Sequence, residues 1–190
     1  MVNQQSKLNP AQWVKLYGNV LYRYTIARVD DSEEAADLVQ ETMLAALKGA
    51  VAYKGEASEK NWLFSILKNK IVDHYRNKAS RRTFQELPEL DEDESHWFDT
   101  EGRWQANGIP LEWCYSQTPA ERKELQRIIE QCKEDLKEVQ RQVFVLKYME
   151  DRESDFICKV LNISASNYWV LLHRCRLQMR TCVEHHWLKN

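Results

Sequence analysis

The feature that most constrains the fold is the spacing of large apolar residues, which recur in steps of three and four along most of the chain. The first such stripe consists of Trp13, Tyr17, Val20, Tyr24 and Ala27. This spacing is typical of amphipathic helices. The 190 residues include only 5 Gly and 4 Pro, which argues against turn-rich β folds. The sequence therefore predicts an all-α fold.

Further helical stripes follow the first one. The second and third stripes consist of Leu38, Val39, Thr42, Met43, Ala46, Leu47 and Ala50, and then of Leu63, Ile66, Leu67, Ile71 and Tyr75. Beyond residue 119 the stripes consist of Leu125, Ile128, Ile129, Cys132 and Leu136, then Val139, Val143, Leu146 and Met149, and finally Tyr168, Leu172, Cys175, Met179 and Cys182. Each stripe predicts one buried helix face.

Residues 84–118 interrupt the periodicity and are acidic, with prolines and glycines. They also contain several large apolar side chains, too many for a linker that makes no contacts. We therefore predict two small helical domains, over 9–82 and 119–185, joined by an acidic linker over 83–118 that docks in part onto a partner surface.

Charge is distributed unevenly, although the net charge is only −2. Between Lys60 and Arg82 there are seven basic residues and one acid, whereas residues 84–102 contain eight acids and no Lys or Arg. Such blocks are often two solvated surfaces, but a basic helix beside aromatic residues also suits single-stranded nucleic acid. The chain thus offers a candidate polyanion-binding helix followed by an acidic connector.

Local sequence signals predict the starts of three helices, and the arrangement of the last helices forms one recognisable motif. Asp31 with Glu34 is typical of a capping box, and Ser58 and Ser164 are candidate helix caps. Near the C-terminus a short helix, a turn over 161–164 and a longer helix form a helix-turn-helix pattern. A plain helical hairpin with solvated arginines has the same pattern, so the motif alone leaves DNA binding open.

Catalytic and cofactor motifs are missing from the sequence. It contains no Walker A loop, no glycine-rich dinucleotide motif, no nucleophile elbow and no H-E-x-x-H. We therefore expect no enzyme activity and no cofactor. No run of apolar residues is long enough to span a membrane, and the N-terminus has no apolar signal segment, which predicts a cytoplasmic protein.

The five cysteines occur at wide spacing without a C-x-x-C motif, which predicts reduced thiols in that compartment. A zinc site from Cys175, Cys182, His185 and His186 is conceivable. However, the spacing C-x₆-C-x₂-H-H is not a usual ligand pattern, and both cysteines fall on the apolar stripe of the last helix. We favour the structural role and predict no metal site.

Two strings in the first half carry a family resemblance. Asp37-Leu38-Val39-Gln40-Glu41-Thr42-Met43, followed by the run from Trp62 to Arg76, resembles the N-terminal conserved domain of extracytoplasmic-function sigma factors. The run from Gln140 to Phe144 and the string Leu172-His173-Arg174-Cys175-Arg176 are similar to the second domain of that family. The resemblance implies a two-domain factor that binds the β′ and β subunits of core RNA polymerase and directs the enzyme to promoter DNA.

The resemblance also implies roles for residues at matching positions. The outer face of the 37–47 helix would bind core polymerase through Asp37, Gln40, Glu41 and Leu44. The following loop and basic helix would open the −10 element and hold its single strand, through Tyr53, Lys54, Asn61, Trp62, Lys68, Asn69, Lys70 and Arg76. The acidic linker would thread through basic channels of the polymerase.

The last helix would read the −35 element in the major groove, through Ser166, Asn167, Trp169, Val170, His173, Arg174 and Arg176. Trp169, Val170 and Leu171 stand where the family usually has polar contacts. Helical geometry predicts that Leu171 packs inward and that Trp169 and Val170 lie away from the core stripe, toward DNA or toward a covering protein surface.

Two other functions remain open at this point. A helix-turn-helix regulator that occupies an operator needs no polymerase-binding face, so the 37–47 helix distinguishes it from a sigma factor. A metal- or redox-sensing switch would use the C-terminal Cys and His residues, and the zinc content of the protein would test it. An anti-sigma protein is a possible further partner implied by the resemblance.

Overall fold

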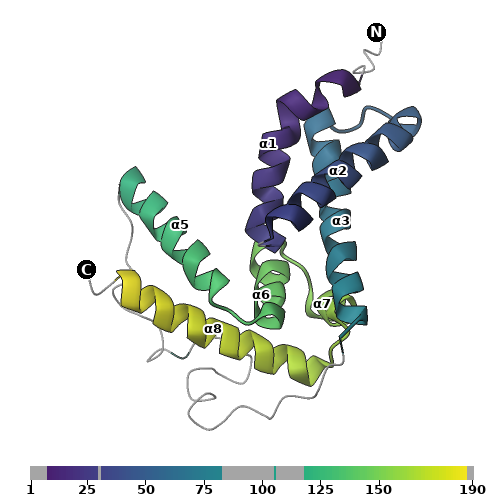
Figure 1. Cartoon of the computed structure of the whole chain (residues 1–190). Coiled ribbons are helices and arrows are strands. Elements are labelled where there is room, and N and C mark those ends of the chain that lie inside the picture. Colours follow the sequence, from purple (N-terminus) through teal and green to yellow (C-terminus); the bar gives the residue numbers. More distant parts are fainter. Residues whose placement is uncertain (1–7, 30, 83–104, 106–117, 188–190) are drawn as a thin grey trace. The chain divides into compact units, whose positions relative to one another are not determined.

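The structure is a computed structural model that describes residues 8–29, 31–82, 105 and 118–187. Its regular elements are helices, and none of these described residues forms a strand, which confirms the predicted all-α fold (Figure 1). The chain divides into two compact units, residues 1–79 and 80–190. The predicted linker and its docking lie outside the described residues apart from Gln105. None of the described helices is both long and apolar enough to cross a bilayer.

The described part of the first unit forms three α-helices, α1 (Pro10–Val29), α2 (Ser32–Gly49) and α3 (Glu59–Ser80), with a 3₁₀ turn at Ala50–Ala52 after α2. Its core is apolar and fully enclosed: Trp13, Leu21, Leu63, Leu67 and Ile71 are at most 1% exposed. Tyr75 of α3 is buried too, and its hydroxyl donates a 2.6 Å hydrogen bond to the Arg28 carbonyl oxygen of α1. The inward stripe predicted for α3 is correct.

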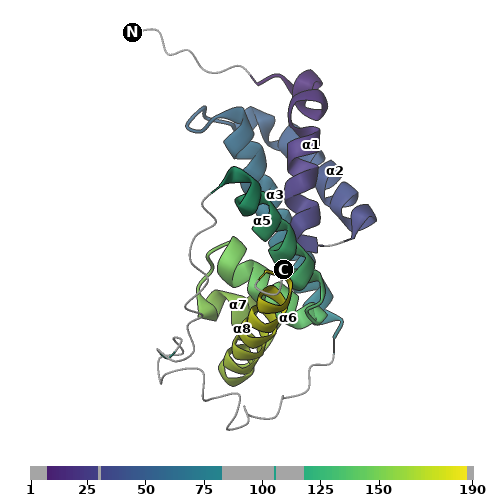
Figure 2. The ribbon, with the colours of Figure 1, turned by 90° about the vertical axis from the view of Figure 1, so that its left-hand side faces the viewer.

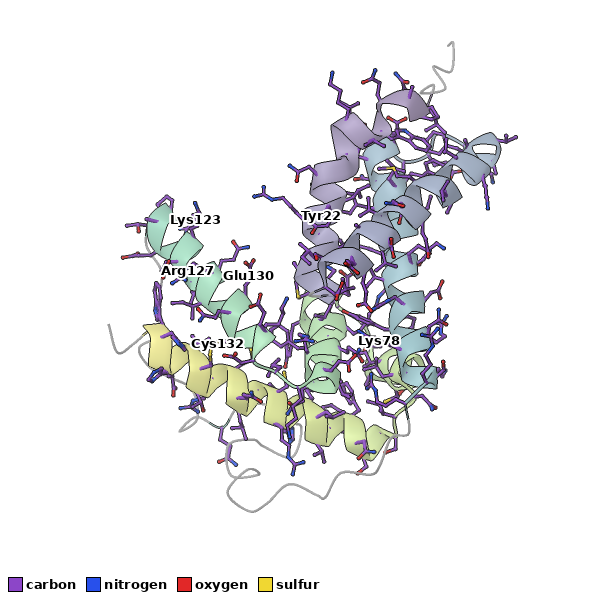
Figure 3. All side chains as sticks on the ribbon, in the orientation of Figure 1. Tyr22, Lys78, Lys123, Arg127, Glu130 and Cys132 are labelled. Carbon is purple, nitrogen blue, oxygen red and sulfur yellow. A yellow bond between two sulfur atoms is a disulfide. The ribbon has the colours of Figure 1, made fainter. Side chains whose placement is uncertain are left out.

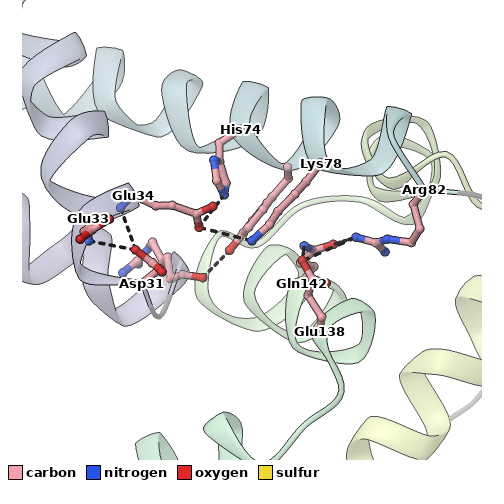
Figure 4. Close-up of polar contacts among 10 residues, drawn as sticks. Asp31, Glu33, Glu34, His74, Lys78, Arg82, Glu138 and Gln142 are labelled. Atoms are coloured by element: carbon pink, nitrogen blue, oxygen red, sulfur yellow. Dashed lines mark hydrogen bonds and ion pairs between the residues drawn. The ribbon is translucent and has the colours of Figure 1, made fainter.

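The predicted helix starts are confirmed by hydrogen bonds. The Asp31 side chain caps α2 by accepting from the amides of Glu33 and Glu34, each at 2.9 Å (Figure 4). The Glu34 carboxylate reaches α3 instead, 3.3 Å from the Lys78 ammonium and 3.4 Å from the His74 ring (Figure 4). These contacts join the start of α2 to the last turns of α3.

Three predicted stripes are partly wrong. Val20 of α1 is 37% exposed, while Leu21 and Thr25 are buried. Leu47 of α2 is 49% exposed, and Ile129 of the second unit is 37% exposed. The α1 face shifts because this helix contacts both neighbours: Tyr24 meets Phe64 of α3 edge-on, with ring centroids 5.1 Å apart. Leu47 lies in the last turn of α2, beyond the reach of the α1 core.

A single carboxylate holds the start of α3 against the start of α1. Glu59 accepts hydrogen bonds from the Trp13 indole at 2.5 Å, the Asn9 amide at 2.7 Å and the Tyr17 hydroxyl at 3.1 Å. Partial burial acts to raise the pKa of Glu59, but the hydrogen bonds from Trp13, Asn9 and Tyr17 outweigh it and lower the pKa below 4.5. In the sequence Glu59 is only an acid in a first helical turn, so its role was not predicted.

We expect Glu59→Gln to lower the free energy of unfolding by about 1 kcal/mol, because the amide keeps an acceptor but loses its charge. The ionised form is favoured in the folded state, so its contribution is present above the unfolded pKa. It is lost as pH falls through the lower folded pKa. Urea unfolding of both proteins between pH 7 and pH 3 measures this. The gap between them should close in acid, and a constant gap would contradict the assignment.

The second unit is built around one long helix. It contains α5 (Pro119–Glu134), α6 (Glu138–Phe144) with a π-helical turn at Val145–Met149, α7 (Ser154–Leu161) and α8 (Ala165–Trp187). Thr118 and Glu121 form a capping box at the start of α5. Helices α6 and α7 lie against the first half of α8 (Figures 1 and 2). Ile128 and Cys132 of α5, and Leu136 just after α5, pack on the second half. This packing explains the different burial along α8.

The prediction of reduced thiols is wrong for one pair. Cys132 of α5 and Cys182 of α8 form a disulfide, and their Cα atoms are 5.7 Å apart (Figure 3). The α5–α8 packing brings together two residues that are 50 positions apart in sequence, a proximity that spacing alone could not show. Cys158 and Cys175 are free thiols, and Cys114 lies outside the described residues.

Candidate nucleic-acid interface

The outer face of α2 is polar with an apolar centre. Asp37, Gln40 and Glu41 are exposed, as predicted, and Leu44 beside them is 57% exposed. The opposite face of α2 packs inside the unit, where Leu38, Thr42 and Ala46 are buried. An exposed leucine among polar groups is available to a partner, because no core contact within this unit covers it.

Aromatic rings support the loop between α2 and α3. Tyr53 stacks obliquely on Trp62 at 4.9 Å between centroids, and Trp62 meets Trp13 edge-on at 6.0 Å. The Tyr53 hydroxyl donates a hydrogen bond to the Ala57 carbonyl oxygen. The structure therefore brings together Tyr53 and Trp62, and leaves both partly accessible. Such ring edges and faces are the surfaces on which unstacked bases bind.

The basic side of α3 continues from this aromatic group. Lys68 lies 5.8 Å from the centre of the Tyr24 ring, and Lys70 forms a 2.9 Å ion pair with Glu41 of α2. Arg76 pairs with Asp73 at 2.7 Å, and both side chains remain more than half exposed. The other predicted residues, Lys54 of the loop and Asn61 and Asn69 of α3, are exposed.

A polar hollow of about 330 Å³ joins the two predicted surfaces of the first unit. It is lined by Leu38 and Glu41 from α2 and by Lys70, Asp73, His74, Arg76 and Asn77 from α3. The α2 face and the basic side of α3 are thus neighbours, and the Glu41–Lys70 pair connects them.

The helix-turn-helix of the second unit has the geometry that its sequence predicts. Asn162 ends α7 in the left-handed conformation, with φ of 52°, which turns the chain sharply into the next helix. The Ser164 hydroxyl accepts a 3.2 Å hydrogen bond from the Asn167 amide and so caps α8, as predicted. The short α7 and long α8 are therefore held at a fixed turn.

Two residues predicted to contact DNA are buried in α8. Asn167 is 4% and Val170 is 6% exposed. The prediction assumed that only one narrow stripe of α8 is covered. Both α6 and α7 pack on its first half, which widens the buried arc to include these positions. The exposed apolar pair predicted at 169–170 is therefore reduced to Trp169, which is 44% exposed, while Leu171 packs inward as predicted.

The remaining predicted residues of α8 keep some exposure. Ser166 is exposed, and His173, Arg174 and Arg176 are half-buried. Burial lowers the pKa of His173, and the Arg176 guanidinium adds to this effect, which favours the neutral imidazole. The cations that this helix can offer to phosphates are consequently its arginines rather than His173.

Comparison with known proteins identifies both units. The profile of Sigma-70 region 2 matches residues 13–81, and that of Sigma-70 region 4 matches residues 126–179. A probable RNA polymerase sigma factor of Haemophilus influenzae is 32% identical over 156 residues, 82% of this chain and 80% of that protein. The ECF RNA polymerase sigma factor SigM of Bacillus subtilis is 24% identical over 166 residues, covering 87% and 90%.

A solved structure is also similar to this chain. It is the sigma factor RpoE of Bartonella quintana in complex with the anti-sigma factor NepR, with a TM-score of 0.42, 16% identity and coverage of 92% of this chain and 96% of that one.

Proposed function

The chain belongs to the extracytoplasmic-function group of the sigma-70 family, whose members act in promoter-specific transcription initiation by RNA polymerase, and from this premise we propose a role for each of its surfaces. The α2 face of Asp37, Gln40, Glu41 and Leu44 binds core polymerase. It does so as a polar rim around one apolar anchor, an arrangement common in protein interfaces.

The loop after α2 and the basic side of α3 bind the opened −10 element. Tyr53 and Trp62 offer rings to an unstacked base, with Lys54 and Asn61 exposed on the loop and at the start of α3. Lys68, Asn69, Lys70 and Arg76 track the strand backbone. The single observation that supports this assignment best is the Glu41–Lys70 pair, because it makes the polymerase face and the DNA face of one unit contiguous.

The second unit reads the −35 element through the exposed side of α8, at Ser166, Trp169, Arg174 and Arg176. Residues 83–118 serve as the acidic linker between a promoter-melting domain over 9–82 and a duplex-reading domain over 119–185. The factor works in the cytoplasm with core polymerase and contributes no catalysis of its own. A regulator that only occupies an operator would not use the exposed α2 face.

Run-off transcription with purified core polymerase on a randomised promoter library tests this function and also yields the preferred sequences. We expect specific transcripts that depend on this chain, with selected bases at both elements. Operator occupancy would instead give DNA binding without polymerase and no transcript.

We expect Arg174→Gln to weaken binding to −35 duplex DNA about tenfold and to reduce the logarithmic salt slope by about 0.9, because one duplex phosphate contact is lost. Arg180→Gln is the matched control, because Arg180 is held by Glu184 at 2.8 Å on a later turn of α8. Fluorescence anisotropy with the selected promoter measures both the affinity and its salt slope between 50 and 200 mM salt. Over this range a protein with many phosphate contacts loses about 10³–10⁵-fold in affinity. Equal effects of the two substitutions would contradict the assignment of Arg174.

A further inference from the structure

The structure brings together a set of metal-ligating side chains that differs from the set weighed from the sequence and shares only Cys182 and His186 with it. Of the residues discussed for zinc from the sequence, Cys175 is fully buried in the core between α5 and α8. The cysteine that lies next to Cys182 in the structure is Cys132 of α5. One ring nitrogen of His186 and the sulfur atoms of Cys132 and Cys182 all lie within 4.8 Å of one another.

A fourth candidate ligand, a carboxylate oxygen, lies close to these three atoms. The Asp135 carboxylate Oδ2 is 4.0 Å from Sγ of Cys182. The Asp135 backbone is fixed to α8, since Gln178 Nε2 donates a 3.0 Å hydrogen bond to its carbonyl oxygen. Cys132 and Asp135, the residue that caps the end of α5, are spaced C-x₂-D, and Cys182 and His186 of α8 are spaced C-x₃-H. These intervals are as short as those between paired ligands of structural zinc sites.

We propose that Cys132, Asp135, Cys182 and His186 form a tetrahedral zinc site when the two cysteines are reduced. Thiolate and imidazole ligands at about 2.3 and 2.05 Å from a tetrahedral ion are about 3.6 Å apart. Sγ of Cys182 and Nδ1 of His186 are 3.6 Å apart in the structure. The ligands come from α5, from the residue that directly follows it and from α8, which pack together, so the ion would link α5 to α8.

The surroundings fit the chemistry of such a site. Cys132 is fully buried, and Ile128, Leu136 and Val183 pack around it, while His186 and Asp135 lie toward the surface, where an ion can enter. Nδ1 of His186 is 2.9 Å from the Cys182 carbonyl oxygen, on the same turn of α8 as the Cys182 sulfur.

The disulfide and the zinc site exclude each other because they use the same two sulfur atoms. A peroxide converts one form into the other: the two zinc-bound thiolates lose two electrons and form the S–S bond. Hydrogen peroxide with two protons accepts those electrons and leaves as two waters, and Zn²⁺ is released. The structure shows the product of this conversion at Cys132 and Cys182.

The experiment uses the full chain, reduced with a phosphine, stripped with a chelator and titrated with ZnCl₂ against a chromophoric competitor. We expect one zinc per chain for the wild type and for Cys158→Ser, whose thiol is the matched control. We expect no stoichiometric binding for Cys132→Ser and Cys182→Ser, and at least tenfold weaker binding for Asp135→Asn and His186→Ala. Addition of hydrogen peroxide should release the zinc and form one disulfide.

Cobalt substitution keeps the proposal testable if the cysteine variants do not fold. Reduced wild-type protein with CoCl₂ should show a thiolate-to-cobalt charge-transfer band and the visible bands of a tetrahedral ion. Their absence overturns the site. Zinc binding that persists in Cys132→Ser also overturns it, and so does reversible disulfide formation in a wild-type chain that binds no zinc.

Discussion

Replacing Lys68, Lys70 and Arg76 together by Gln should reduce open-complex formation about 100-fold at 0.1 M salt. Each lost contact with a single-strand phosphate lowers the logarithmic salt slope by about 0.7, so three contacts lower it by about 2. The stability of the first unit should change little, because the Lys70–Glu41 and Arg76–Asp73 pairs are exposed and such pairs contribute about 0–1 kcal/mol. Permanganate footprinting of the melted strand at several salt concentrations measures the effect.

The matched control carries the same change in net charge on other faces, as Lys15→Gln, Arg23→Gln and Lys123→Gln, all at exposed positions. It should melt promoters at nearly the wild-type level, apart from a small loss of long-range attraction. If the control and the test variant lose the same amount, the strand does not follow the basic side of α3.

The second large effect is expected on polymerase binding. Asp37→Ala with Leu44→Ala should weaken the affinity for core polymerase about 100-fold, because each removes an interface contact and Leu44 is the apolar anchor of the face. Both side chains are exposed, so the free energy of unfolding should change by less than about 0.5 kcal/mol for each. Titration of labelled factor with core polymerase measures the affinity, and urea unfolding measures the stability.

Glu33→Ala with Leu16→Ala is the control for this pair. It also removes one carboxylate and one leucine from exposed positions, on the first turn of α2 and on α1. A loss confined to the Asp37/Leu44 variant supports the assigned face. An unchanged affinity for that variant, with normal stability, would show that α2 meets the polymerase elsewhere or not at all.

Local sequence patterns predicted what depends on one helix at a time. The caps at Asp31, Ser58 and Ser164 were predictable, because each hydroxyl or carboxylate satisfies amides within three residues of itself. The exposed α2 face was also predictable, because the periodicity of a single helix separates its apolar face from its polar face. The resemblance to sigma factors added the functional assignments, which spacing alone would not have given.

Features that depend on several helices at once were missed. Val170 is buried because two neighbours cover the start of α8, and periodicity describes only a single covering surface. Glu59 gains its role from donors that lie 42 to 50 residues away in sequence. The Cys132–Cys182 bond likewise depends on how α5 crosses α8, so a count of cysteines and their spacing could not predict it.

The ring contacts of Tyr53, Trp62 and Trp13, together with the Glu59 hydrogen bonds, have a consequence for the cost of capturing a base. Ordering one backbone residue costs about 1–2 kcal/mol of conformational entropy. Tyr53 of the loop and Trp62 of α3 are already held when the domain folds. For the base capture proposed above, the entropy is therefore lost during folding, once per molecule, and not each time a promoter opens. A stacking surface prepared in this way leaves more of the weak base–ring attraction available to hold the strand apart.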